Sequence, residues 1–207
     1  MGVNSTKRTS TTEQPHHNVA GALIALCHRR WSLPVIAQLH RTSGAKFVAL
    51  VKRLGASRDS LAQTLRALAE RGWVTKNSGY GHPMRPEYLL TSVGQGIGPV
   101  CDQLMTQIES RNAADLALKK WSLPVLWRLT HGDQRFGDLK DALAGITPRA
   151  LTQALKDLQG AGFVDRDVAD DYPPQVRYRL TSPGRDLGEQ LIELADRLGP
   201  SESEQVD

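Results

Sequence analysis

The chain has 207 residues, of which 40% are hydrophobic and 23% charged, as expected of a soluble globular protein with one large domain or two small ones. No apolar run reaches the roughly 18 residues that a membrane-spanning helix needs, so we predict no membrane partner. The polar N-terminus has no apolar core for export, so we predict a cytoplasmic protein. The formal net charge of +4 suits a polyanionic partner but is uneven, because residues 1–110 carry 13 Lys or Arg against 6 Asp or Glu, whereas residues 111–207 carry 13 against 16.

An internal repeat organises the chain. The sequence Trp-Ser-Leu-Pro-Val at residues 31–35 recurs letter for letter at residues 121–125, an offset of 90. At the same offset, residues 57–94 share 12 identities in 38 positions with residues 147–184, where chance would give roughly two or three. We therefore predict a disordered tail at 1–17, one domain at 18–110, a second copy of it at 111–200 and a short tail at 201–207.

The first copy predicts helices followed by a hairpin. A helix opens near Trp31, a short helix spans Phe47–Leu54, and after a tight turn a third helix carries leucines at the i, i+4, i+7 spacing of a buried face. Gly72 ends that helix, an aromatic-Val pair starts a strand, and a second strand leads to Thr91-Ser92, which are candidate caps of the next helix. The leucine stripes of the two copies are Leu61, Leu65 and Leu68, and Leu151, Leu155 and Leu158.

The second copy repeats this order with one extra residue in the turn Ala144-Gly145-Ile146. Its short helix is predicted at Phe136–Leu143, its strands follow Gly162, and Thr181-Ser182 precede the last helix. Three helices, a two-stranded wing and a further helix make a winged helix-turn-helix, in which the face opposite the leucines enters a major groove. We predict a mainly α fold with small β-wings, of the α+β class, in two tandem domains.

At these residues the sequence resembles the HxlR-type (MarR-like) family of bacterial regulators. The second copy shows it best, in KKWSLPVLWRL from Lys119, in RFGDLKDALAGITPRALTQALKDLQGAGFVDR from Arg135, and in YPPQVRYRLTSPGRDL from Tyr172. The first copy keeps fewer of these motifs, and together the copies cover about residues 18 to 198. The resemblance implies a DNA-binding transcriptional regulator, with a repressor favoured, that is not an enzyme.

Members of this family usually carry one such unit and dimerise through their terminal helices, so the resemblance implies an intramolecular pseudo-dimer here. The helices after Gly94 and Gly184 would then pack together with the segments before Trp31 and Trp121. The alternative is packing within each copy, and the pseudo-dimer could also pair with a second chain. The apolar stripes of the two helices are Ile97, Val100, Leu104 and Ile108, and Leu187, Leu191, Leu194 and Leu198.

Many family members sense oxidants through a cysteine about a dozen residues before the Trp of the opening helix. Here Asn18 lies near that place, while Cys27 lies four residues before Trp31 and next to basic residues that could lower its pKa. A redox role for Cys27 therefore stands beside the simpler interpretation, a buried and reduced thiol like that of Cys101.

The candidate DNA contacts lie off the leucine stripes, on the wings and on the short helices, where Arg, Lys, Gln, Ser and Thr reach base edges and phosphates. A solvated helix surface is the alternative for any one of them. In the first copy they are Lys46, Arg58, Ser60, Gln63, Arg66, Lys76 and Arg85, and in the second Arg135, Arg149, Thr152, Gln153, Lys156, Arg166 and Arg177.

The two wings differ in charge. Asp165, Asp167, Asp170 and Asp171 would oppose phosphates in the second copy, so its wing need not touch DNA. We therefore predict an asymmetric pseudo-palindromic site in double-stranded DNA, with stronger contacts from the first copy's wing.

Other functions find less support. Six histidines show no metal-ligand spacing, and phosphate-binding glycine loops and nucleophile motifs are absent, so we predict no metal, no cofactor and no catalysis. The main alternative is a degenerate pair that serves as a small-molecule sensor or protein-interaction module without sequence-specific DNA binding. An effector pocket between the copies, compatible with either function, would be lined by Trp31, Met105, Trp121 and Trp127.

Overall fold

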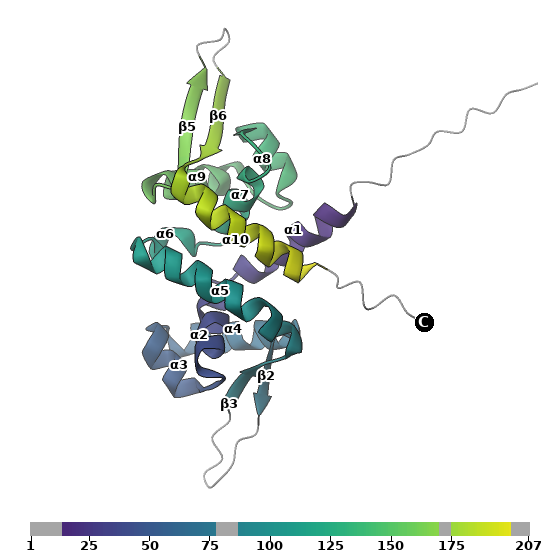
Figure 1. Cartoon of the computed structure of the whole chain (residues 1–207), viewed down its shortest axis with the longest axis vertical. Coiled ribbons are helices and arrows are strands. Elements are labelled where there is room, and N and C mark those ends of the chain that lie inside the picture. The colour runs from purple at the N-terminus through teal and green to yellow at the C-terminus, as the bar shows by residue number, and fades with distance from the viewer. Residues whose placement is uncertain (1–13, 78–86, 170–174, 200–207) are drawn as a thin grey trace, which may run out of the picture.

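Each copy of the repeat folds into helices that carry a β-wing (Figure 1). The computed structural model describes residues 14–77, 87–169 and 175–199. The first copy consists of α1 (Gln14–Cys27), α2 (Ser32–Thr42), β1 (Ala45–Lys46), α3 (Phe47–Leu54), α4 (Arg58–Glu70), β2 (Val74–Asn77), β3 (Glu87–Leu90) and α5 (Ser92–Ser110). The second copy consists of α6 (Ala114–Ala117), α7 (Ser122–Leu129), β4 (Gln134–Arg135), α8 (Phe136–Ala142), α9 (Pro148–Gly160), β5 (Val164–Ala169), β6 (Gln175–Leu180) and α10 (Ser182–Leu198).

The predicted winged helix-turn-helix order is confirmed in both copies. Helix α3 has the predicted bounds, and α8 ends one residue before the predicted Leu143. All six leucines of the two stripes are buried on α4 and α9. Gly72 and Gly162 follow these helices with φ angles of 70° and 72°, the left-handed conformation that glycine adopts at low cost.

The wings hold one strand more than predicted. Strand β1 pairs antiparallel with β3, and β4 pairs with β6, so each wing is a three-stranded sheet in the order β1-β3-β2 or β4-β6-β5. Two residues are too short a run to show a period of two, which is why alternation did not predict these strands. The pairing anchors Lys46 and Arg135 to the wing where α3 and α8 begin.

A Thr-x-x-Gly motif joins each wing to its terminal helix. Thr91 caps α5 by accepting the Gly94 N–H at 3.1 Å, and Thr181 caps α10 by accepting the Gly184 N–H at the same distance, as predicted. Each threonine hydroxyl also donates to the carbonyl of the glycine that precedes the wing, Gly72 or Gly162. A Cβ on Gly94 would lie 2.0 Å from the Trp73 carbonyl oxygen, so glycine alone permits this close approach.

The terminal helices hold the two copies together. Helix α5 packs on α10, while α1 packs on α10 and α7, and α6 packs on α5. Ile97, Leu104, Leu191 and Leu194 are fully buried. The predicted intramolecular pseudo-dimer is therefore confirmed, and its wings lie at opposite ends of the long axis (Figure 1).

Polar contacts also cross between the copies. Arg30 pairs with Asp115, and the Arg197 Nη1 donates to the Gly96 carbonyl at 2.7 Å. Helix α1 begins at Gln14, inside the segment predicted as a tail. Among the residues described, no helix is both long and apolar enough to cross a membrane.

The close approach of Gly94 to the Trp73 carbonyl can be tested with two substitutions on α5. Gly94→Ala should destabilise the chain by about 1–3 kcal/mol, because the added methyl group has no space against the Trp73 carbonyl. Gly96→Ala is the control, since nothing lies within 4 Å of its Cβ position, and it should be neutral or stabilise by up to about 1 kcal/mol. Urea unfolding measures both, and equal midpoints would contradict the packing described.

Candidate nucleic-acid interface

Helices α4 and α9 are the helices whose faces opposite the leucines are predicted to enter a major groove, and they are called the reading helices below. Each of them begins at a side-chain cap. Ser57 accepts the Ser60 N–H at 3.2 Å, and Thr147 accepts the Ala150 N–H at 3.2 Å, which satisfies an otherwise unpaired donor at each start. The leucines bury one face of each helix, and the opposite face is exposed. That face carries Arg58, Gln63 and Arg66 on α4, and Arg149, Thr152, Gln153 and Lys156 on α9, whereas Ser60 is half-buried.

Two of these side chains are held by local contacts. The Arg58 guanidinium lies over the Phe47 ring at 5.7 Å, which links the start of α4 to the start of α3. The Thr152 hydroxyl donates to the Pro148 carbonyl at 2.9 Å, one turn back along α9. Both contacts restrict the orientation of a side chain on the exposed face.

The two equivalent glutamines are tied to the start of their own domains. In the first copy, the Arg29 Nη1 donates to the Gln63 Oε1 at 3.0 Å. In the second, the Gln153 Nε2 donates to Asp157 at 3.0 Å, and Lys119 pairs with the same carboxylate at 2.9 Å. Arg29 and Lys119 are equivalent at the repeat offset of 90. Neither basic residue is among the predicted contacts, although the presence of a cation at the same repeat position in both copies is visible in the sequence.

The second wing is less repulsive to phosphate than its sequence indicates. Arg179 on β6 faces Asp165 and Asp167 on β5, at 3.9 Å and 3.6 Å, so two of the four predicted acids have a partner. Arg166 and Arg177 are exposed on the same hairpin. Asp170 and Asp171 lie outside the described residues.

The remaining predicted contacts lie on the first wing and at the helix starts. Lys76 is exposed on β2, and Lys46 is exposed where α3 begins. Arg135 is exposed at the start of α8, and its Nη2 donates to Gln175 on β6. Arg85 lies outside the described residues.

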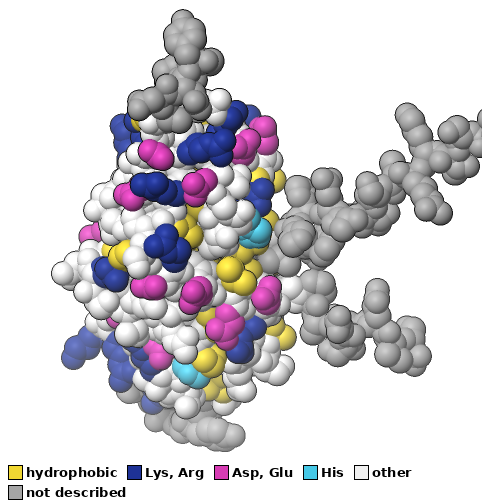
Figure 2. All heavy atoms as spheres, turned by 45° about the horizontal axis from the view of Figure 1, so that its top comes forward, with side chains coloured by type: hydrophobic (Ala, Val, Ile, Leu, Met, Phe, Trp, Pro, Cys, Tyr) yellow, Lys and Arg dark blue, Asp and Glu magenta, His cyan; other side chains and the backbone are white. Residues whose placement is uncertain are grey.

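Charge is divided unequally between the two units. Residues 45–77 hold seven Lys or Arg against two Asp or Glu, and the corresponding residues 134–167 hold five against five. Figure 2 shows basic and acidic side chains interleaved over the second copy, and basic ones gathered at the opposite end. The first copy therefore offers the stronger attraction to a polyanion.

The four residues predicted to line an effector pocket lie in the core or at the starts of α2 and α7. Met105 and Trp127 are buried in the core, and Trp127 meets the His131 ring edge-on at 5.0 Å. Trp31 and Trp121 are half-buried beneath equivalent cations, Arg30 at 5.5 Å and Lys120 at 4.9 Å. None of the four lines the pockets found at Cys27, His40 or His28.

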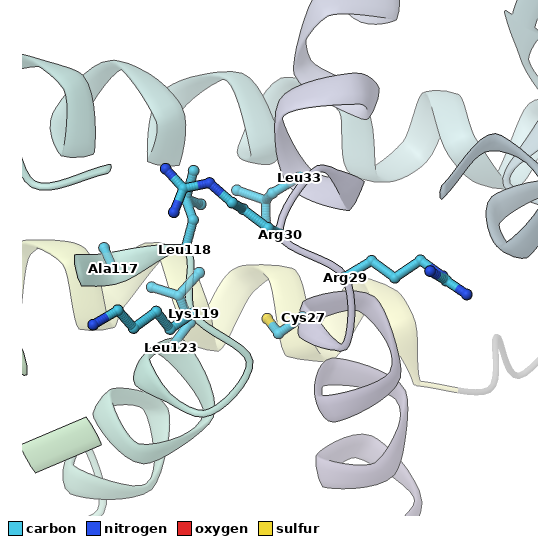
Figure 3. Close-up of a pocket in the computed structure, with 8 residues that line it drawn as sticks. All are labelled: Cys27, Arg29, Arg30, Leu33, Ala117, Leu118, Lys119 and Leu123. Carbon is cyan, nitrogen blue, oxygen red and sulfur yellow. The ribbon is translucent and has the colours of Figure 1, made fainter. Parts of the chain in front are cut away.

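The space between the copies is small where Cys27 lies (Figure 3). It measures about 10 Å³, which is the lower limit for one water molecule. Its walls come from Cys27, Arg29, Arg30 and Leu33 in the first copy, and from Ala117, Leu118, Lys119 and Leu123 in the second. The surroundings of Cys27 favour the neutral thiol, because burial raises its pKa to about 12. Burial raises the pKa of Cys101 as well.

Among the described residues, no group of three or more His, Cys, Asp or Glu side chains is placed to hold a metal ion. What the chain does present is two capped helices with exposed basic and amide side chains, each beside a β-wing. This arrangement defines the class of winged helix-turn-helix proteins.

The comparison with known proteins gives the family. The HxlR-like helix-turn-helix family matches the chain twice, at residues 26–115 and at residues 116–204. The chain belongs to this family and carries its domain in tandem.

Named relatives are transcriptional regulators. The chain is 42% identical over 82 residues to the uncharacterized HTH-type transcriptional regulator sll1512 of Synechocystis, across 40% of this chain and 61% of that protein, less than two thirds of its length. It is 35% identical over 83 residues to the uncharacterized HTH-type transcriptional regulator YvaP of Bacillus subtilis, across 40% of this chain and 77% of that protein. Among solved structures, the reduced form of the transcriptional regulator YodB of B. subtilis is 26% identical, with a TM-score of 0.38, 48% of this chain and 96% of that chain covered.

The neutral thiol of Cys27 predicts slow reaction with alkylating agents in the folded chain. A rise in pKa from the ordinary 9.0 to about 12 lowers the thiolate fraction by about three orders of magnitude at neutral pH. A short pulse of N-ethylmaleimide, followed by peptide mass spectrometry, should therefore label neither cysteine in the native protein and both in denaturant. Fast labelling of Cys27 alone in the native protein would instead support its predicted redox role.

Proposed function

We propose that the protein is a DNA-binding transcriptional regulator that reads double-stranded DNA through α4 and α9. The observation that carries the proposal is the pair of reading helices, each with an exposed polar face, held on two copies around one shared core. A pseudo-two-fold protein suits a pseudo-palindromic operator, as helix-turn-helix dimers suit their two half-sites. Relatives named as HTH-type transcriptional regulators support the same function.

The operator is asymmetric in this proposal. Arg149 occupies the repeat position at which the first copy has Asp59, and the first copy carries the excess of basic over acidic residues. The half-site bound by α4 therefore receives more phosphate contacts, and the half-site bound by α9 relies more on its exposed amide and hydroxyl groups. The protein represses in this proposal, because a bound pseudo-dimer occludes the DNA it covers.

Specific binding is tested by gel shift with the DNA upstream of the protein's own gene. A regulator that makes about six phosphate contacts should lose about a thousandfold in affinity between about 50 and 200 mM salt. An unrelated duplex of equal length serves as the control. Absence of a shift at low salt would favour the alternative, a sensor or interaction module that does not bind specific DNA.

The asymmetry is tested at one equivalent pair. Arg66 and Lys156 occupy the same repeat position and are both exposed. Arg66→Ala should weaken binding more than Lys156→Ala, since the more basic half makes more phosphate contacts. It should also lower the slope of log affinity against log salt concentration by about one. Arg111→Ala, an exposed arginine at the end of α5, is the control and should leave affinity unchanged. Equal losses from Arg66→Ala and Lys156→Ala would refute the asymmetry.

A further inference from the structure

The first copy contains a pocket of about 140 Å³ between the α1–α2 junction and the end of its reading helix. Three basic residues, His28, Arg29 and Arg71, line it together with Ser32. The rest of the wall is apolar and includes Ala67 and Trp73. The pocket is thus a small space with a cationic side and a hydrophobic side.

The cations of this pocket lack a counter-charge. Within the described part of the chain, neither Arg29 nor Arg71 forms an ion pair, although Arg71 lies over the Trp73 ring at 5.7 Å. The pKa of His28 is lowered by burial, and further by the neighbouring Lys120, Arg29 and Arg71. The neighbouring cations thus add to the cost that burial sets on a positive charge at His28, and a bound anion would lower that cost.

The second copy supplies the missing anion from its own sequence. At the position of Ala67, it has Asp157, which is only 6% exposed. Both oxygens of this carboxylate accept from the Lys119 Nζ, at 3.0 Å and 2.9 Å, and Oδ1 also accepts from the Gln153 Nε2 at 3.0 Å. Lys119 and Gln153 are the equivalents of Arg29 and Gln63. The same basic and amide partners thus surround a carboxylate in one copy and an alanine methyl group in the other.

We propose that the first copy binds a small organic carboxylate in this pocket, with the ligand's carboxylate taking the place that Asp157 fills in the second copy. Arg29 and Arg71 bind the charge, and Arg29 offers the planar fork that matches a carboxylate. Ala67, Leu68 and Trp73 cover the ligand's apolar body. The volume suits a body of a few carbon atoms, since an engineered apolar cavity of about 150 Å³ holds benzene.

The ligand reaches the reading helix through Arg29. That guanidinium now donates to Gln63 on the exposed face of α4, and a bound carboxylate competes for the same donors. Binding therefore changes how Gln63 is held, in the way that Asp157 holds Gln153. This regulatory step rests on the proposed function, whereas the binding step does not.

Binding is tested with sodium butyrate on the full chain without DNA, by calorimetry. We expect saturable binding of one butyrate per chain and no binding of butyramide, its neutral isostere. Ala67→Asp places the missing carboxylate in the pocket and should weaken butyrate binding by at least about tenfold, or about 1.4 kcal/mol. Ala67→Asn, the matched neutral variant, should bind butyrate far better than Ala67→Asp does.

A second variant guards against misfolding at position 67. Arg71→Met removes one cation from an exposed position and should also weaken butyrate binding about tenfold, with circular dichroism confirming the fold. Absence of saturable binding, equal binding of butyramide, or equal effects of Ala67→Asp and Ala67→Asn would each overturn the proposal. Loss of DNA affinity in Arg71→Met without any butyrate binding would assign the pocket to a DNA phosphate instead, which also overturns it.

The regulatory step is measured separately, as operator affinity with and without butyrate. A change of several-fold that Ala67→Asp abolishes supports it. Butyrate binding without that change would refute the coupling and leave the carboxylate site standing. Butyrate binding by a chain that shifts no DNA would refute the proposed function alone.

Discussion

The pairing of α5 with α10 is the interaction on which the rest of the structure depends. A winged unit of this size buries little on its own, and each terminal helix packs both on its own copy, α5 on α2 and α10 on α7, and on the terminal helix of the other copy. Helices α1 and α6 close over the same core, so each copy completes the other. The loops that leave α1 and α6 carry Arg29, Arg30 and Lys119, which reach the reading helices and the opposite copy. The placement of both reading helices is therefore set by this shared core.

Fusion of the copies allows the two halves to differ in sequence, which is impossible in a homodimer. In a two-fold symmetric pair each substitution appears in both halves, whereas here each half changes alone. The charge has separated accordingly, with seven basic residues against two acidic in one reading unit and five against five in the other. At the start of each domain, Asp157 neutralises Lys119 in the second copy, while Ala67 leaves Arg29 beside an open pocket. The shared core keeps the geometry symmetric, and the chemistry of the two units has diverged.

Much of this fold is predictable from the sequence because its determinants are local or periodic. The leucine stripes, Gly72 and Gly162, and the caps at Thr91 and Thr181 each act within one or two turns of chain, and the repeat shows that they occur twice. The site was less predictable. Ties such as that between Arg29 and Gln63 join residues 34 positions apart, so they depend on tertiary packing that no periodicity reveals. The pocket at Ala67 was not predicted for the same reason, since an alanine on a helix does not indicate a binding site by itself. Its significance depends on the contact between Lys119 and Asp157, the residue at the equivalent position.

The two reading helices differ in how their equivalent glutamines are held, and in the proposed function this difference would place regulation at α4. Asp157 is buried and accepts three hydrogen bonds, so displacing α9 would leave a charge without partners in a poorly solvated place. Gln63 is exposed and held by one hydrogen bond from Arg29, so water can replace this partner when Gln63 moves. The neighbouring Arg30 binds Asp115 of the other copy, so a shift between the copies of the 1–2 Å seen at other regulatory interfaces would move Arg29 too. In the proposed function, a small displacement of α4 would therefore act on the more basic half of the interface, while the contacts of Asp157 would keep α9 in place.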